Sequence, residues 1–110
     1  MKSRVNEESA AVWYQSVNYG YEGLALVLKD ALEQAQSGKG AERHGEHGTF
    51  SEQPVMTVTE QVGLGFPLGQ AMKKIIESQR TGITPEAAKA ERLGAIVYIA
   101  AAILADKEYP

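Results

Sequence analysis

The sequence predicts an all-α protein in which a long N-terminal helix, a Gly-rich central loop, a broken second helix and an Ala-rich C-terminal helix pack as a helical homo-oligomer. Apolar residues recur every three or four positions through residues 6–37, as one face of a helix requires. Glycine and proline gather in residues 38–54, and small apolar residues dominate residues 93–105. The 110 residues match the usual size of one domain, so we expect a single helical domain over residues 1–110 with 38–54 as its functional loop.

The first expected helix runs from about Asn6 to Ser37. Its apolar face consists of residues spaced by three or four, namely Trp13, Val17, Tyr21, Leu24, Leu28, Leu32 and Ala35. Gly20 and Gly23 interrupt this pattern, and each costs about 1 kcal/mol relative to alanine inside a helix. Two interpretations stay open: an amphipathic core helix with a local weakness, or a face that packs closely on another subunit as a coiled-coil seam.

The central segment, residues 38–54, contains four glycines and one proline in 17 residues, which is the composition of a loop. A loop this long inside a compact domain is usually either functional or disordered. We therefore expect the binding function to lie in this segment.

Residues 55–80 form the second expected helix, although the β-branched residues of 55–62 would also suit a strand. A lone short strand would lack a partner, so a helix is favoured, broken at 63–67 and resuming to Ser78 or Arg80. Thr84 followed by Pro85 predicts the start of a last helix, which runs to about Lys107. Apolar residues cover so much of this helix that we expect burial nearly all round, against a neighbouring subunit.

Charge and composition exclude several classes of function. The net charge of -3 and the isoelectric point of about 5.4 give no basic field for nucleic acid. The absence of cysteine excludes disulfides and thiolate metal sites. The longest strongly apolar stretch, residues 93–105, is too short to span a bilayer, and no secretory signal opens the chain, so we expect a cytoplasmic protein without a membrane partner.

The sequence contains no nucleophile elbow, dinucleotide fingerprint or Walker motif, so whether the protein is an enzyme stays uncertain, leaning to no. Nucleotide pyrophosphohydrolases of the MazG type are also small, helical and oligomeric, but they need two helical pairs of carboxylates for Mg²⁺. Only Asp30 and Glu33 have that spacing here. His44 and His47 with a nearby glutamate could bind a divalent metal, but in a Gly-rich loop they lack a fixed geometry. We therefore expect neither a catalytic residue nor a cofactor or metal.

Recognition of an anion is the remaining chemistry. Lys39, Arg43, His44 and His47 supply donors on a Gly-rich backbone that a phosphate can approach closely. Phe50, Gln53 and Lys73 complete the expected ligand-binding set, through a stacking face, an amide and a positive charge. Since the loop has a net charge of -1, Glu42 or Glu52 must serve as a structural partner or bind a ribose or base. The alternative is an oligomer-contact loop held by internal salt bridges.

Four segments carry a family resemblance: 38–44 (GKGAERH), 50–54 (FSEQP), 65–74 (GFPLGQAMKK) and 93–96 (LGAI). With them the last two thirds of the chain resembles a family of small, mostly uncharacterised phage-encoded proteins. Its architecture is similar to that of the helical phage sponges that sequester signalling nucleotides of the CBASS and Thoeris defence systems. The family resemblance itself implies a phage origin and no particular activity. The architectural similarity, together with the ligand donors and the missing catalytic set, leads us to expect a nucleotide-binding sponge in the cytoplasm of an infected host cell. Two alternatives stay open: a protein-binding inhibitor of a host factor, and a MazG-like pyrophosphohydrolase.

Overall fold

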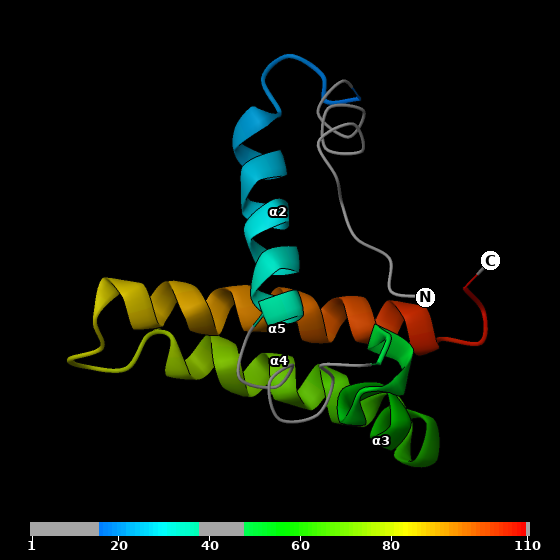
Figure 1. Ribbon diagram of the computed structural model, residues 1–110. Helices are drawn as coiled ribbons and strands as arrows, with labels where there is room; N and C mark the ends of the chain where they lie inside the picture. The colour runs from blue at the N-terminus through cyan, green and yellow to red at the C-terminus, as the bar shows by residue number, and fades with distance from the viewer. Residues whose placement is uncertain (1–15, 38–47, 110) are drawn as a thin grey trace.

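The computed structural model describes residues 16–37 and 48–109 (Figure 1). Every regular element in these ranges is a helix, which confirms the all-α class, while packing as a homo-oligomer stays a prediction. The elements in chain order are α2 (Glu22–Ser37), the short 3₁₀ helix η2 (Phe50–Glu52), α3 (Pro54–Val62), α4 (Gly65–Glu77) and α5 (Pro85–Ala105). None of the described helices has both the length and the apolar character needed to cross a membrane.

The helices α4 and α5 lie side by side and run in opposite directions (Figure 1). The helix α3 packs against both of them, near the C-terminal end of α5. The helix α2 contacts α5 through its C-terminal half and stands away from the α4–α5 pair like an arm (Figure 1). The chain therefore has one compact layer of helices and one helix that projects from it.

The first helix is shorter than predicted. Residues 16–21 form turns rather than helix, and α2 begins at Glu22, so the prediction of helix is wrong for this stretch. The cause is Gly20, whose φ of 90° is left-handed and incompatible with a continuing right-handed helix. The Glu22 side chain stabilises the turn by accepting a hydrogen bond of 2.9 Å from the backbone N–H of Gly20. The predicted part before residue 16 lies outside the described residues.

The predicted break in the second helix is confirmed. The helix α3 ends at Val62, and Gly63 follows with φ 98° and ψ 179°, a conformation open essentially to glycine alone. The helix α4 then begins at Gly65, with Pro67 in its first turn as expected. Residues 55–62 are helical, so the ambiguity between strand and helix resolves to helix. Thr59 fits there because its buried hydroxyl donates to the carbonyl of Val55 at 2.6 Å.

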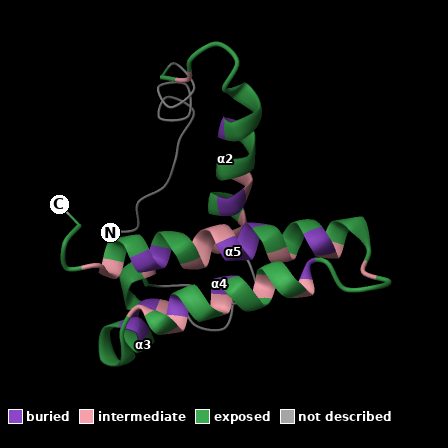
Figure 2. Cartoon of the chain, turned by 180° about the vertical axis from the view of Figure 1, so that it is seen from behind, coloured by how far each residue is buried: buried purple, intermediate pink, exposed green. Residues whose placement is uncertain are grey.

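The start of α5 is as predicted, since the Thr84 hydroxyl accepts a hydrogen bond of 3.1 Å from the N–H of Ala87 and Pro85 occupies the first position. The helix ends at Ala105, two residues before the expected end. Its buried residues are mostly small, namely Ala88, Leu93, Gly94, Ala95, Ala101 and Ala102. However, Ile99 and Ile103 are exposed in the single chain. Much of the surface of α5 is exposed (Figure 2), and its burial against a neighbouring subunit stays a prediction.

Candidate functional surface

Four of the seven predicted ligand-binding residues, Lys39, Arg43, His44 and His47, lie outside the described residues. The two histidines of the metal alternative belong to the same group. The nucleotide site predicted for the central segment therefore stays a prediction at these positions, and the structure bears on its remaining members.

The described end of the central segment contains Phe50 and Gln53. Phe50 opens η2 and is half-buried, and Gln53 forms the junction between η2 and α3 and is also half-buried. Glu52 holds this turn together, because its carboxylate accepts a hydrogen bond of 2.9 Å from the backbone N–H of Thr49. A Cβ at Gly48 would lie 2.9 Å from the same carboxylate, so a larger residue there would require the Glu52 side chain to shift. Glu52 thus serves as a structural partner, one of the two roles expected for it.

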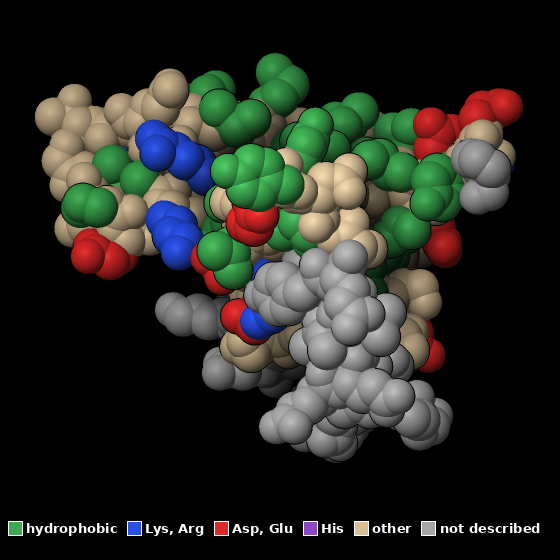
Figure 3. Space-filling model, turned by 90° about the horizontal axis from the view of Figure 1, so that it is seen from above, with side chains coloured by type: hydrophobic (Ala, Val, Ile, Leu, Met, Phe, Trp, Pro, Cys, Tyr) green, Lys and Arg blue, Asp and Glu red, His purple; other side chains and the backbone are tan. Residues whose placement is uncertain are grey.

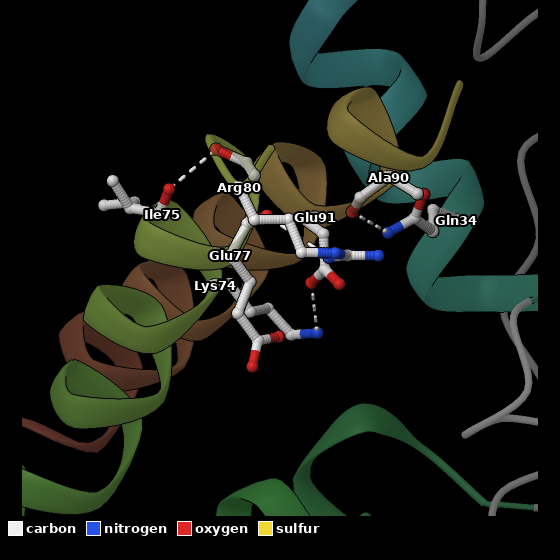
Figure 4. Close-up of polar contacts among 8 residues, drawn as sticks. Gln34, Lys74, Ile75, Glu77, Arg80, Ala90 and Glu91 are labelled. Atoms are coloured by element: carbon white, nitrogen blue, oxygen red, sulfur yellow. Dashed lines mark hydrogen bonds and ion pairs between the residues drawn. The ribbon is translucent and has the colours of Figure 1, made fainter. Parts of the chain in front are cut away.

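The basic residues of α4 have separate roles. Lys73 is exposed, as a residue available to a ligand must be. Lys74 lies 3.3 Å from the carboxylate of Glu91 and 6.0 Å from the ring centre of Tyr98, so it joins α4 to α5 (Figure 4). Gly94 leaves room for the Lys74 side chain, since a Cβ there would lie 2.9 Å from Lys74 Cδ. Lys73 is the member of this pair that remains accessible for binding.

A second contact between α4 and α5 lies at the end of α4. Ser78 is only 2% exposed, and its hydroxyl donates to the carbonyl of Ile75 at 2.7 Å. Arg92 on α5 donates to the Ser78 hydroxyl at 3.0 Å and to the Ser78 carbonyl at 3.2 Å. These two hydrogen bonds from Arg92, which we call the fork, satisfy the Ser78 carbonyl at the C-terminal end of α4, so the role of the fork is structural. No spacing or motif in the sequence indicates this pairing.

The carboxylates considered for a metal are engaged in two different ion pairs. Asp30 lies 3.1 Å from Nζ of Lys89 on α5, and Glu33 lies 2.5 Å from Nζ of Lys29 within α2. Across residues 16–37 and 48–109, no group of three or more acidic or histidine side chains is placed to hold a metal ion. Asp30 therefore helps to attach α2 to α5, and Glu33 pairs with a lysine on the surface of its own helix. The described residues do not bring the two carboxylates together with further ligands for Mg²⁺.

Two of the hollows on the described surface bear on ligand binding. One, of about 650 Å³, lies between the end of α3 and the end of α5, where Glu60, Asp106 and Glu108 outnumber the cation of Lys107. Its net negative charge disfavours an anion. The other, of about 280 Å³, lies at the start of α2 and is mostly apolar, with Val17, Tyr21, Leu24 and Leu28 in its wall beside Ser16 and Asn18. Neither hollow is lined by the net positive charge that favours a phosphate.

The largest feature of the described surface is apolar. One side of α2 presents Tyr21, Leu24, Leu28 and Leu32, which we call the α2 stripe; they are 43% to 59% exposed. One side of α4 presents Leu68, Met72, Ile75 and Ile76, the α4 stripe, at 42% to 67%. Hydrophobic side chains gather across the middle of the face seen from above, with Lys and Arg toward one end (Figure 3).

Exposed apolar surface of this kind is a candidate binding surface, since soluble monomers rarely expose contiguous patches beyond a few hundred Å². On α2 the leucines are exposed, whereas the small Ala25 and Ala31, about 60° to either side of Leu28, are buried. The single chain therefore leaves exposed the apolar face that the periodicity predicted, and its packing on another subunit stays a prediction.

Comparison of the chain with models of known protein families finds no match, and comparisons with curated proteins and with solved structures find none either.

Proposed function

We propose that this protein is a homo-oligomeric, phage-encoded sponge, which binds a small signalling nucleotide of a host defence system and releases it chemically unchanged. The observation that carries the proposal is the pair of exposed apolar stripes on α2 and α4. Burying them between copies would create junctions of the kind in which small ligands are commonly held.

The ligand donors come from the central segment. Lys39, Arg43, His44 and His47 supply positive or hydrogen-bonding groups suited to phosphate oxygens. Within α4, Lys73 lies one residue from Met72 of the α4 stripe and is exposed. If a second copy covers this stripe, Lys73 is placed at the rim of the junction, where it can reach a phosphate. Phe50, which belongs to the central segment, offers an aromatic face on which a base could stack.

A protein-binding inhibitor of a host factor is the second candidate. The same stripes favour it, because an apolar helix face of three or four turns is the usual element for docking on a partner protein. The two candidates differ in what covers the stripes. In a sponge it is the protein itself, and in an inhibitor it is the host protein.

Native mass spectrometry of the full chain tests the proposal, first alone and then after exposure to cyclic dinucleotides and ADP-ribose-type nucleotides. A sponge gives a closed oligomer that retains one of these nucleotides at a fixed ratio and returns it intact after heating. A hydrolysed nucleotide indicates the MazG-like enzyme instead. An oligomer or monomer that retains no nucleotide contradicts the sponge and favours the inhibitor.

The variant Arg43→Ala locates the site. A lost bidentate phosphate contact should reduce nucleotide binding at least tenfold while the melting temperature stays unchanged. Arg80→Ala is the matched control, because it also removes one arginine, from an exposed position just after the end of α4, and leaves the central segment intact. If Arg43→Ala lowers the melting temperature and leaves binding unchanged, Arg43 stabilises the loop and does not bind the ligand.

A further inference from the structure

The side of α2 that faces α5 is distinct from the side that carries the α2 stripe. Asp30 contacts α5 through Lys89 at 3.1 Å, and Gln34 contacts it through the carbonyl of Ala90 at 3.0 Å; Figure 4 shows the second of these contacts. Leu28 and Leu32 each stand two residues before one of these contacts, which is about 160° around a helix axis. These contacts leave Leu24, Leu28 and Leu32 between 43% and 56% exposed, although the small Ala25 and Ala31, about 60° to either side of Leu28, are buried.

The α2 stripe is complementary to a second copy of itself. Consider two α2 helices that pack antiparallel with Leu28 at the two-fold axis. Each residue then lies opposite the residue of the second copy whose number, added to its own, gives 56. Leu24 then meets Leu32 of the second copy, and the large Tyr21 meets the small Ala35 of the second copy. A parallel pair would put tyrosine against tyrosine and alanine against alanine, which leaves a clash at one end and a gap at the other.

The helix dipoles favour the same arrangement. In a parallel pair the two helix dipoles would point the same way, which is unfavourable. The antiparallel pair also places each helix N-terminus next to the C-terminus of its neighbour, which is electrostatically favourable.

The exposed area of the α2 stripe supplies part of such an interface. The four residues of the α2 stripe offer on the order of 400 Å² of apolar surface per copy, about half of what a stable interface contributes. A helix of 16 residues is about 24 Å long, so each tip lies beside the base of the other arm. The tip carries Tyr19, which is 97% exposed and adds apolar area to the contact.

We propose that the protein dimerises through α2, with the two helices antiparallel, Leu28 at the two-fold axis and Leu24 packed against Leu32 of the second copy. The proposal specifies the surface for the homo-oligomer on which the proposed function rests. The mostly apolar hollow at Tyr21, Leu24 and Leu28 receives side chains of the second copy.

Site-directed cysteines test this directly, because the natural chain contains none and gives no background. The variants are Leu24→Cys, Leu28→Cys and Leu32→Cys, all at exposed positions that the fold of one chain does not bury. Under mild oxidation, Leu28→Cys alone should form covalent dimers in most of the protein. Leu24→Cys and Leu32→Cys should each stay largely uncrosslinked alone and give a mixed disulfide when combined.

The matched control is Leu26→Cys, on the same helix and 51% exposed, but about 160° from Leu28 around the axis. It should not crosslink. Self-crosslinking of all three stripe variants indicates a parallel pair, and a Leu26→Cys dimer indicates random collision; either result overturns the proposal. Thermal melting of each reduced variant establishes that it is folded.

Two readouts separate this proposal from the proposed function. An oligomer by native mass without crosslinks at the α2 stripe refutes the α2 pair and leaves the homo-oligomer and its sponge function in place. A monomer at all concentrations refutes both the α2 pair and the assembly. Crosslinks in the expected pattern, without nucleotide binding, support the α2 pair and refute the sponge.

Discussion

The fork between Arg92 and Ser78 makes a quantitative prediction about stability. Ser78→Ala removes a buried acceptor for the Arg92 side chain at 3.0 Å and the donor to the Ile75 carbonyl. Arg92→Met retains most of the packing of the stem and removes the hydrogen bonds to the Ser78 hydroxyl and carbonyl. Because Arg92 is exposed, solvent screens its hydrogen bonds. We therefore expect each variant to lower the free energy of unfolding by about 1–2 kcal/mol.

The two variants together isolate the contact. In a double-mutant cycle we expect a coupling free energy of about 1 kcal/mol, because the second substitution removes a hydrogen bond that the first has already broken. For a chain of this size, 1 kcal/mol corresponds to a shift of about 4 °C in melting temperature. Circular dichroism melting at one fixed protein concentration measures this, since assembly makes the melting temperature depend on concentration.

A matched control is Lys89→Met on the same helix, which breaks the exposed ion pair with Asp30 and should change stability by less than about 0.5 kcal/mol. If the coupling between Ser78 and Arg92 is indistinguishable from zero, the fork does not stabilise the end of α4. In that case the packing of α4 on α5 must hold the helix end without it.

Three further predictions concern helix ends and the α2 stripe. Thr84→Ala should lower the free energy of unfolding by about 1 kcal/mol in a urea titration, since it removes the cap of α5, and Thr84→Ser should restore most of it. Gly63→Ala should lower the free energy of unfolding by about 1–3 kcal/mol, because Gly63 has a φ of 98°. Gly69→Ala, inside α4 with open space around it, should instead raise the free energy of unfolding by about 0.5–1 kcal/mol. A similar effect of both variants would contradict the backbone argument. Leu28→Asp should shift the mass in analytical ultracentrifugation toward the monomer, while Leu26→Asp should not, and equal effects of the two would exclude a specific α2 face.

The predicted site is only partly tested by the fold. Glu52 shows the kind of role that sequence reasoning can anticipate, because its partner Thr49 is three residues away and the geometry of a turn is local. The pairing of Lys74 with Glu91 could not be predicted, since it joins residues 17 apart and depends on how α4 packs on α5. This ion pair leaves Lys73 as the more accessible of the two adjacent lysines of α4.

Gly20 shows why the length of α2 was overestimated. Apolar periodicity continues through it, and a glycine inside a helix costs only about 1 kcal/mol, so the pattern favoured one long helix. The structure instead uses the freedom of this glycine for a turn, which Glu22 stabilises. The choice between a tolerated glycine and a turn depends on which packing each permits, and that is not a property of the local sequence.

The sequence by itself determined the helical class, the break at Gly63 and the start of α5 at Thr84. These features follow from backbone conformation and hydrogen bonds between residues within a turn of one another, which the order of residues specifies directly. Only the tertiary structure decided that α5 contacts one side of α2 and that the leucines of the other side stay exposed. Periodicity identifies an apolar face, but whether the same chain buries that face depends on contacts between residues distant in sequence, such as Gln34 with Ala90.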